Sequence, residues 1–172
     1  MEPSGTEVRN GKGRWIQSPA RLLAAIILCN MAGFVGSLVT VTGPGSWYQG
    51  LVKPSFSPPN FVFGPVWTTL YILMGISLYL VWMESLAGKK TTVALVFFGA
   101  QLGLNTLWSF LFFGLQSPFL GLIEICVLWA CIVATVVLFF RIKPAAAYLL
   151  VPYLLWVTFA SFLTYTIWVL NG

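Results

Sequence analysis

The sequence contains no histidine and very little charge. Only 8% of its 172 residues are Asp, Glu, Lys or Arg, whereas an ordinary soluble domain carries about 25%. The lack of histidine removes the commonest general base and the commonest metal ligand, so hydrolytic and zinc chemistry of the usual kinds are not expected. We therefore predict no metal site and no cofactor.

Cysteine is also scarce. Cys29, Cys126 and Cys131 make an odd number, and all of them lie within apolar runs. Such a set is not a disulfide framework, and free cysteines in apolar surroundings are usually small packing residues. The net charge of +5 could indicate an acidic partner such as nucleic acid. However, the basic residues are distributed as in a protein oriented in a membrane, so no nucleic-acid partner is expected.

Hydrophobic residues, in contrast, make up 59% of the chain. A helix that crosses about 30 Å of hydrocarbon needs roughly 20 apolar residues. The stretches that meet this need are residues 19–41, 61–84, 91–114, 118–140 and 144–169. Prolines open several of them, at positions where a first helical turn tolerates proline. The sequence predicts an all-α fold, an integral membrane bundle of five transmembrane helices over 19–172, preceded by a disordered polar tail over 1–18.

The basic residues predict the orientation of the bundle. One side carries Arg9, Lys12, Arg14, Arg21, Lys89, Lys90, Arg141 and Lys143, and the other side carries only Lys53. Basic residues accumulate on the cytoplasmic side of membrane proteins, so the N-terminus is predicted to be cytoplasmic. No organelle signal is visible, which favours a prokaryotic plasma membrane; the mitochondrial outer membrane is the alternative.

The only long connection, residues 42–60, is rich in glycine and proline, which should prevent a regular helix through it. It nevertheless carries Trp47, Tyr48, Leu51 and Phe56. Long loops in compact domains are usually functional or disordered, and the aromatic residues favour a lid folded over the outer mouth of the bundle. The alternative is an interfacial segment whose Trp and Tyr side chains lie among lipid headgroups.

Polar and aromatic residues recur at helical spacing in three of the predicted spans. They are Trp67, Tyr71 and Met74, then Gln101, Asn105, Trp108 and Phe112, and finally Tyr153, Trp156, Ala160 and Leu163. Polar groups within a bilayer usually face the bundle interior. Such faces predict an apolar cavity with a few orienting hydrogen-bond partners, which suits a large, flat, poorly soluble ligand. The alternative is ordinary helix packing, with the polar groups satisfied between helices.

Two further features lie inside the predicted spans. Glu124 is an intramembrane acid and hence a candidate functional residue, although a hydrogen bond to a neighbouring helix would also account for it. Gly99 and Gly103 form a GxxxG pattern, which permits close approach of two helices and predicts a dimer interface, although the pattern is common.

Several motifs occur together in one order along the chain. They are Trp47-Tyr48-x-x-Leu51-x-Lys53-Pro54, Val62-Phe63-Gly64-Pro65-Val66-Trp67-x-x-Leu70-Tyr71, Gln101-Leu-x-Leu104-Asn105-x-x-Trp108 and Pro152-Tyr153-x-x-Trp156-x-x-Phe159-Ala160. From about residue 20 to the end, the chain resembles the translocator protein family, also called the tryptophan-rich sensory proteins or peripheral-type benzodiazepine receptors.

This resemblance implies a five-helix bundle, usually a homodimer, whose ligand cavity opens under the first loop. The ligands that it implies are porphyrins such as protoporphyrin IX, sterols and synthetic benzodiazepines. It assigns porphyrin handling to Trp47 and Trp156, a pocket position to Asn105, a place beside the ligand to Ala160, and the dimer helix to Gly99 and Gly103. A C-terminal sterol motif would need a basic residue after Tyr165, and none follows, so sterol recognition through that motif is doubtful.

The predicted ligand-binding residues are Trp47, Lys53, Trp67, Tyr71, Asn105, Trp108, Tyr153, Trp156 and Ala160. Together they favour a receptor or transporter-like membrane protein that binds porphyrins and acts in tetrapyrrole handling or stress sensing. The alternative is an enzyme that degrades porphyrin in light, with Trp47 and Trp156 as candidate catalytic residues, although no conventional acid/base pair or nucleophile is visible. A structural or lipid-binding membrane protein is the third possibility.

Overall fold

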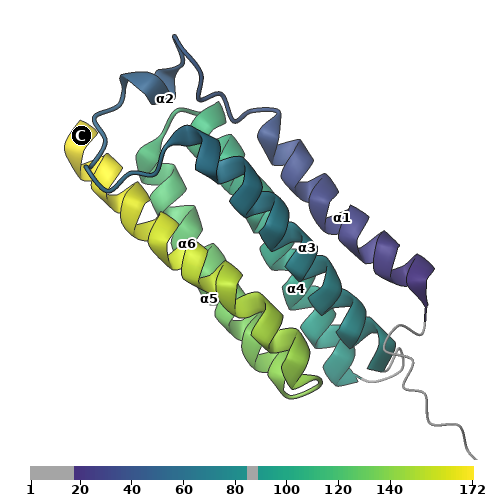
Figure 1. Cartoon of the computed structure of the whole chain (residues 1–172). Helices are drawn as coiled ribbons and strands as arrows, with labels where there is room; N and C mark the ends of the chain where they lie inside the picture. The colour runs from purple at the N-terminus through teal and green to yellow at the C-terminus, as the bar shows by residue number, and fades with distance from the viewer. Residues whose placement is uncertain (1–17, 85–88) are drawn as a thin grey trace, which may run out of the picture.

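The computed structural model describes residues 18–84 and 89–172, so all but the last residue of the predicted tail lies outside the described residues. Within them the regular elements are helical (Figure 1). They are α1 (Pro19–Ser37), α2 (Trp47–Gly50), α3 (Asn60–Glu84), α4 (Lys89–Ser109), the π-helical turn η1 (Phe110–Gly114), α5 (Pro118–Phe140) and α6 (Pro144–Asn171). Five segments of the described chain are long and apolar enough to cross a membrane: α1, α3, α4 with η1, α5 and α6. The prediction of an all-α bundle with five spans is confirmed.

Proline marks the beginning of three of these helices. Pro19, Pro118 and Pro144 each lie in a first turn, where the missing backbone N–H has no intrahelical acceptor in any case. Before Pro118, the hydroxyl oxygen of Ser117 accepts a hydrogen bond from the Leu120 N–H at 3.3 Å. The side chain of Ser18 makes no such capping bond, so proline alone marks the start of α1.

The first span ends earlier than its hydropathy predicts. Helix α1 stops at Ser37 rather than at residue 41, and the hydroxyl of Thr40 donates to the Gly36 carbonyl at 2.9 Å just beyond it. Residues 40–44 combine β-branched side chains with a Gly-Pro pair, which disfavour continuation of a helix although they are apolar enough for a span. The connection also contains the single-turn helix α2, where no regular helix was expected; the Ser46 hydroxyl accepts from the Gln49 N–H at its start.

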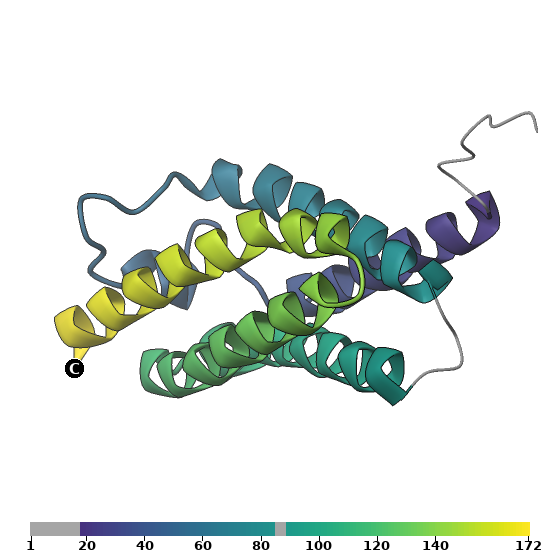
Figure 2. The same ribbon diagram turned by 90° about the horizontal axis from the view of Figure 1, so that it is seen from below.

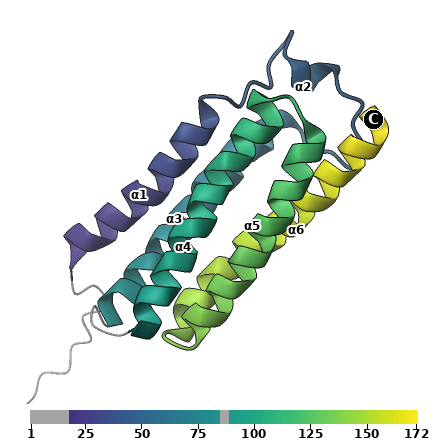
Figure 3. The same cartoon turned by 180° about the vertical axis from the view of Figure 1, so that it is seen from behind.

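The spanning helices form two layers with α1 at one side. Helices α3 and α6 lie together on the face seen in Figure 1, whereas α4 and α5 lie on the opposite face in Figure 3. Figure 2 shows the same two layers from below. Helix α1 contacts α3 and α4 rather than α6. Four long helices, α3 to α6, therefore form the two layers, and α1 alone packs at the remaining side against α3 and α4.

Glycines allow α1 to approach its neighbours closely. A Cβ atom on Gly75 of α3 would lie 2.5 Å from the Cα atom of Ile26, and one on Gly36 of α1 would lie 3.0 Å from the Ser109 hydroxyl of α4. Small residues permit such backbone contacts between membrane helices. The hydroxyl of Thr106 also donates to the Ala32 carbonyl at 3.1 Å. Helix α1 is thus held against α3 near Gly75 and against α4 near Ser109.

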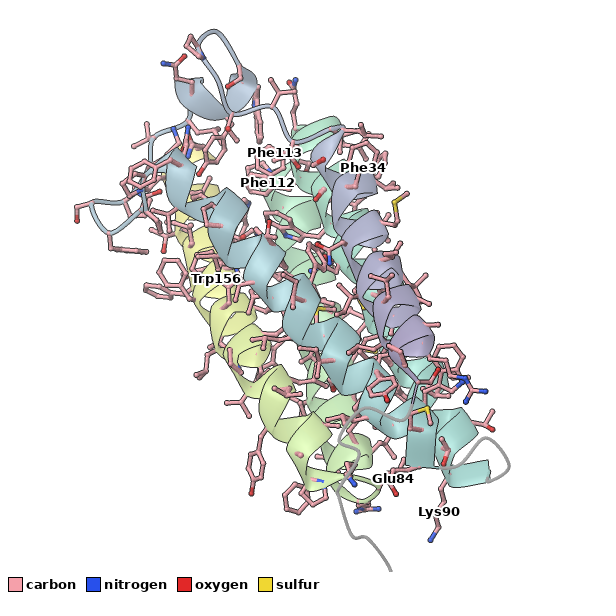
Figure 4. The ribbon with its side chains drawn as sticks, turned by 45° about the vertical axis from the view of Figure 1, so that its right-hand side comes forward. Phe34, Glu84, Lys90, Phe112, Phe113 and Trp156 are labelled. Atoms are coloured by element: carbon pink, nitrogen blue, oxygen red, sulfur yellow. The ribbon has the colours of Figure 1, made fainter. Side chains whose placement is uncertain are left out.

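The ends of the bundle differ in charge. Lys143 forms an ion pair with Glu84, and the Arg21 guanidinium lies 5.8 Å from the centre of the Trp82 ring. Figure 4 shows Glu84 and Lys90 at the end of the bundle opposite to Phe112 and Phe113. Surface ion pairs of this kind contribute little to stability. The charges at this end therefore result from where the basic residues lie in the chain, and they contribute little to holding the fold together.

The Gly75 contact predicts a sensitive position in the fold. Gly75→Ala should lower the free energy of unfolding in detergent by about 1–3 kcal/mol, because the added methyl group overlaps the Ile26 backbone. Gly64→Ala, on the same helix, is the matched control, since a Cβ atom there meets nothing within 4 Å. Unfolding followed by circular dichroism in a titration with a denaturing detergent measures both. Equal stability of the Gly75→Ala variant and the unchanged protein would show that α1 and α3 do not pack at this point.

Candidate functional site

A cavity of about 570 Å³ lies in the half of the bundle nearest the 42–60 connection. Its volume is in the range of small-molecule binding sites in proteins. Helix α1 lines it with Asn30, Gly33, Phe34 and Ser37; α3 with Asn60, Phe63, Gly64, Trp67, Thr68 and Tyr71; and α4 with η1 adds Asn105, Trp108, Ser109, Phe112 and Phe113. Helices α5 and α6 line it with Ile125 and Leu128, and with Trp156, Val157, Ala160, Leu163, Thr164 and Ile167; the segment between α1 and α3 adds Thr40, Thr42 and Tyr48.

Most of the predicted ligand-binding residues meet at this cavity. Trp67, Tyr71, Asn105, Trp108, Trp156 and Ala160 all line it. They come from α3, α4 and α6, because the helical spacing within each span puts its members on one face and the three faces converge. Tyr153 lies directly behind the wall and is fully buried.

A chain of hydrogen bonds joins three helices at one wall of the cavity. The Tyr71 hydroxyl donates to the side-chain oxygen of Asn105, and the Asn105 amide nitrogen donates to the Tyr153 hydroxyl at 3.2 Å. Asn105 is 4% exposed. An amide at such a depth would be costly without partners, so these bonds allow a polar group in the bundle interior and set its orientation.

Aromatic rings form the other walls. The rings of Trp67 and Tyr71 stack with their centres 5.5 Å apart, and those of Trp108 and Phe112 stack at 4.9 Å. Trp156 meets Phe63 edge to face at 5.8 Å, which is a favourable geometry for aromatic pairs. The cavity therefore presents flat apolar surfaces on several sides.

Several buried polar atoms beside the cavity have no hydrogen-bond partner. The indole N–H groups of Trp108 and Trp156 are among them, and both residues line the cavity. The side chains of Gln101 and Glu124 are likewise buried and unpartnered, although neither residue lines the cavity. The hydrogen bond to a neighbouring helix that would have accounted for Glu124 is therefore not formed.

The connection between α1 and α3 lies over one end of the cavity. Two of the predicted site residues, Trp47 and Lys53, lie within this connection. Trp47 packs against Phe112 with ring centres 5.7 Å apart. The ammonium group of Lys53 lies 4.6 Å from the centre of the Tyr48 ring and donates to the Gln49 carbonyl at 3.4 Å. Neither Trp47 nor Lys53 is among the cavity-lining residues; Tyr48 is the residue of α2 that reaches the cavity.

Tyr48 is 4% exposed. Burial raises the pKa of its phenol above the usual value, and a hydrogen bond with Ser57 acts in the opposite direction. The hydroxyl is therefore neutral at physiological pH, so Lys53 contacts an aromatic ring and not a phenolate.

The connection is held to α6 through its middle, and its two ends are joined to each other. Asn171, at the end of α6, accepts from the Val52 N–H at 2.9 Å and donates to the Val52 carbonyl at 3.0 Å. The Asn60 amide donates to the Thr42 carbonyl at 3.0 Å, and Phe56 stacks on Phe162. Residues 42–59 thus lie folded across the end of the bundle rather than extending away from it, and we refer to this segment as the lid.

The cavity is polar in places but uncharged: none of the described residues that line it is Asp, Glu, Lys or Arg. Part of this polarity comes from α1, which sequence analysis did not assign to the site. Asn30 and Ser37 line the cavity from this helix. An amide within an otherwise apolar span was the available signal for Asn30, because such groups usually face the bundle interior.

Gly99 and Gly103 lie away from this cavity. Both are on the outer face of α4, where a Cβ atom would meet nothing within 4 Å. The single chain therefore places the GxxxG pattern on a surface that another membrane helix could approach.

Comparison with known proteins matches residues 25–169 to the model of the TspO/MBR family. The chain is 46% identical over 152 residues to the tryptophan-rich protein TspO of Archaeoglobus fulgidus, a match that covers 88% of this chain and 97% of that relative. It is 48% identical over 151 residues to the protein of the same name from Chlorobaculum tepidum, with coverage of 87% and 95%. The human translocator protein is 41% identical over 157 residues, with coverage of 90% and 89%. The cavity thus lies in a multi-pass membrane protein that belongs to the TspO/MBR family.

Proposed function

We propose that this protein is a membrane receptor or transporter-like protein that binds porphyrins, with protoporphyrin IX as the representative ligand. The observation that carries this proposal is the uncharged cavity of about 570 Å³ whose walls include Trp67, Trp108 and Trp156. A flat macrocycle would stack on these rings, and its burial would contribute roughly 25 cal/mol per Å² of apolar surface.

The polar groups of the site support an orienting role. Asn105 is held by Tyr71 and Tyr153, so its side chain is set in advance of ligand binding. The indole N–H groups of Trp108 and Trp156 are unpaired donors that a pyrrolic or carbonyl acceptor would satisfy after a rotation of the ring. Lys53 lies at the outer end, outside the lining, and would attract a propionate of the bound macrocycle that projects toward that end.

The names of the relatives refer to translocation and to sensing. Both activities require that a ligand first binds to the protein. Binding in a cavity accounts for either, because a ligand shifts the population of any state that it binds more tightly. We therefore propose a role in tetrapyrrole handling or stress sensing.

Titration with protoporphyrin IX tests the binding proposal. In darkness, the purified protein in detergent should show saturable quenching of tryptophan fluorescence. Trp156→Phe should weaken binding by about threefold to tenfold, because the smaller ring loses stacking surface worth roughly 0.5–1.5 kcal/mol. Trp129→Phe is the matched control: Trp129 bonds to Thr158 on the outer surface and does not line the cavity. Quenching that does not saturate, or equal affinity in the two variants, would contradict the proposed site.

The same titration under illumination separates binding from light-dependent degradation. A binding protein should leave the absorption spectrum of the bound porphyrin unchanged. Loss of the spectrum only in light, abolished in Trp47→Phe or Trp156→Phe while dark binding persists, would instead support the enzyme.

We also propose that the N-terminus is cytoplasmic and that the membrane is a prokaryotic plasma membrane, on the basis of the basic residues at one end of the bundle. In a chain whose three cysteines are replaced by alanine, Ser55→Cys should react with a membrane-impermeant maleimide on intact cells. Arg141→Cys should react only after permeabilisation. Both positions are exposed in the structure. Labelling in the reverse order would assign the opposite orientation.

A homodimer through α4 is the third proposal, since Gly99 and Gly103 are exposed on this helix. Gly103→Leu should shift the protein from dimer to monomer in multi-angle light scattering, because the larger side chain separates the two helices. Ala24→Leu, on the exposed face of α1, should leave the mass unchanged. A dimer that persists in Gly103→Leu would place the interface elsewhere.

A further inference from the structure

The cavity has a closed side and an open side. On α5 and α6, the lining residues Ile125, Leu128 and Val157 are at most 2% exposed. On α1 and α3, several lining residues are exposed instead. Phe34 is 57% exposed, and Ser37, Gly64 and Thr68 are exposed as well. The cavity therefore reaches the surface of the bundle between these two helices.

Helix packing explains this opening. Helix α1 contacts the α3 backbone at Gly75, but farther toward the lid its close contact, at Gly36, is with Ser109 of α4. Because α1 contacts α3 near Gly75 and α4 near Gly36, the helices α1 and α3 separate on the lid side of Tyr71. Figure 4 shows α1 and α3 close together near one end and apart toward the lid, with Phe112 and Phe113 between them and Phe34 at the edge of α1.

The opening faces hydrocarbon. The lining residues at its edges, Phe34 and Thr68, lie inside spanning helices. Their neighbours on the outer surface are exposed and apolar: Met31 and Val35 on α1, and Ile72 on α3. Such side chains are stable in lipid and would be costly in water.

The water-facing end of the cavity is covered instead. Tyr48 packs against Phe113 there, with ring centres 5.4 Å apart. Asn171 holds Val52 through two hydrogen bonds, and Asn60 holds Thr42 through another. Entry from water would have to pass this folded connection, whereas entry between α1 and α3 would not.

The chemistry of the edges fits a lipid-dissolved molecule. The hydroxyls of Ser37 and Thr68 donate to carbonyls of their own helices, at 2.7 and 3.0 Å, so their oxygens remain as acceptors only. No charged residue lines the cavity within the described chain. An amphipathic, largely apolar molecule can pass such edges, whereas a strongly hydrated ion would lose its water without compensation.

We propose that ligands enter and leave the cavity sideways from the lipid bilayer, through the opening between α1 and α3 bounded by Phe34 and Ser37 on one edge and Gly64 and Thr68 on the other. This rests on the proposed function, because it assigns a route to the ligand of that same site.

Paired threonines on α3 provide the test. Thr68 and Thr69 are both exposed and bond to their own helix in the same way, but only Thr68 lines the cavity. With the full chain in phosphatidylcholine vesicles preloaded with protoporphyrin IX, Thr68→Phe should slow association and dissociation by about tenfold each. Association should slow together with dissociation, because a narrowed route raises the barrier in both directions, whereas a change in affinity alone would alter mainly the dissociation rate. Thr69→Phe should exchange ligand like the unchanged protein.

A second variant guards against misfolding. Gly64→Leu also narrows the opening, at a position where a Cβ atom meets nothing within 4 Å, and it should slow exchange in the same way. Unchanged rates in both Thr68→Phe and Gly64→Leu, with faster exchange in Asn171→Ala, would overturn the proposal and assign the route to the lid. Absence of saturable binding in the unchanged protein is a different outcome, since it would remove the proposed function and the route with it.

Discussion

The hydrogen bonds that join Tyr71, Asn105 and Tyr153 are the interaction on which the interior of this bundle depends. In a membrane there is no water to satisfy a buried amide, so Asn105 requires partners from neighbouring helices. The tyrosine on α3 and the tyrosine on α6 supply them, and this links both layers of the bundle at the level of the cavity. The same bonds fix the orientation of a polar side chain that lines the cavity.

Around this network the helices pack tightly on one side and open on the other. Glycine at position 75 brings the α1 backbone against α3, and farther along Gly36 turns the close contact of α1 toward α4. A helix is nearly rigid over this length, so close contact at one point and a change of partner at another leave a wedge of space. Aromatic rings fill part of the wedge, and the rest is the cavity.

Among the residues that the structure describes, none that lines the cavity carries a charge. A buried charge would need an opposite charge or a metal, whereas the Asn105 amide needs only hydrogen bonds, which Tyr71 and Tyr153 provide. The site can therefore accept large apolar molecules by burial and stacking and can orient them through a few hydrogen bonds. The matched region of the family model, residues 25–169, includes all the spans almost in full, so the family assignment covers the whole bundle.

The sequence by itself determined the number of spans, because the thickness of hydrocarbon requires a run of apolar residues that is hard to mistake. It also determined which faces of α3, α4 and α6 turn inward, since the period of 3.6 residues places Trp67 with Tyr71 and Asn105 with Trp108. Only the tertiary structure decided that α1 lines the cavity with Asn30, that Lys53 lies over Tyr48 outside its walls, and that the bundle opens between α1 and α3. These features follow from where two helices touch and where they part, and such contacts depend on residues far apart in the chain, which no local pattern encodes.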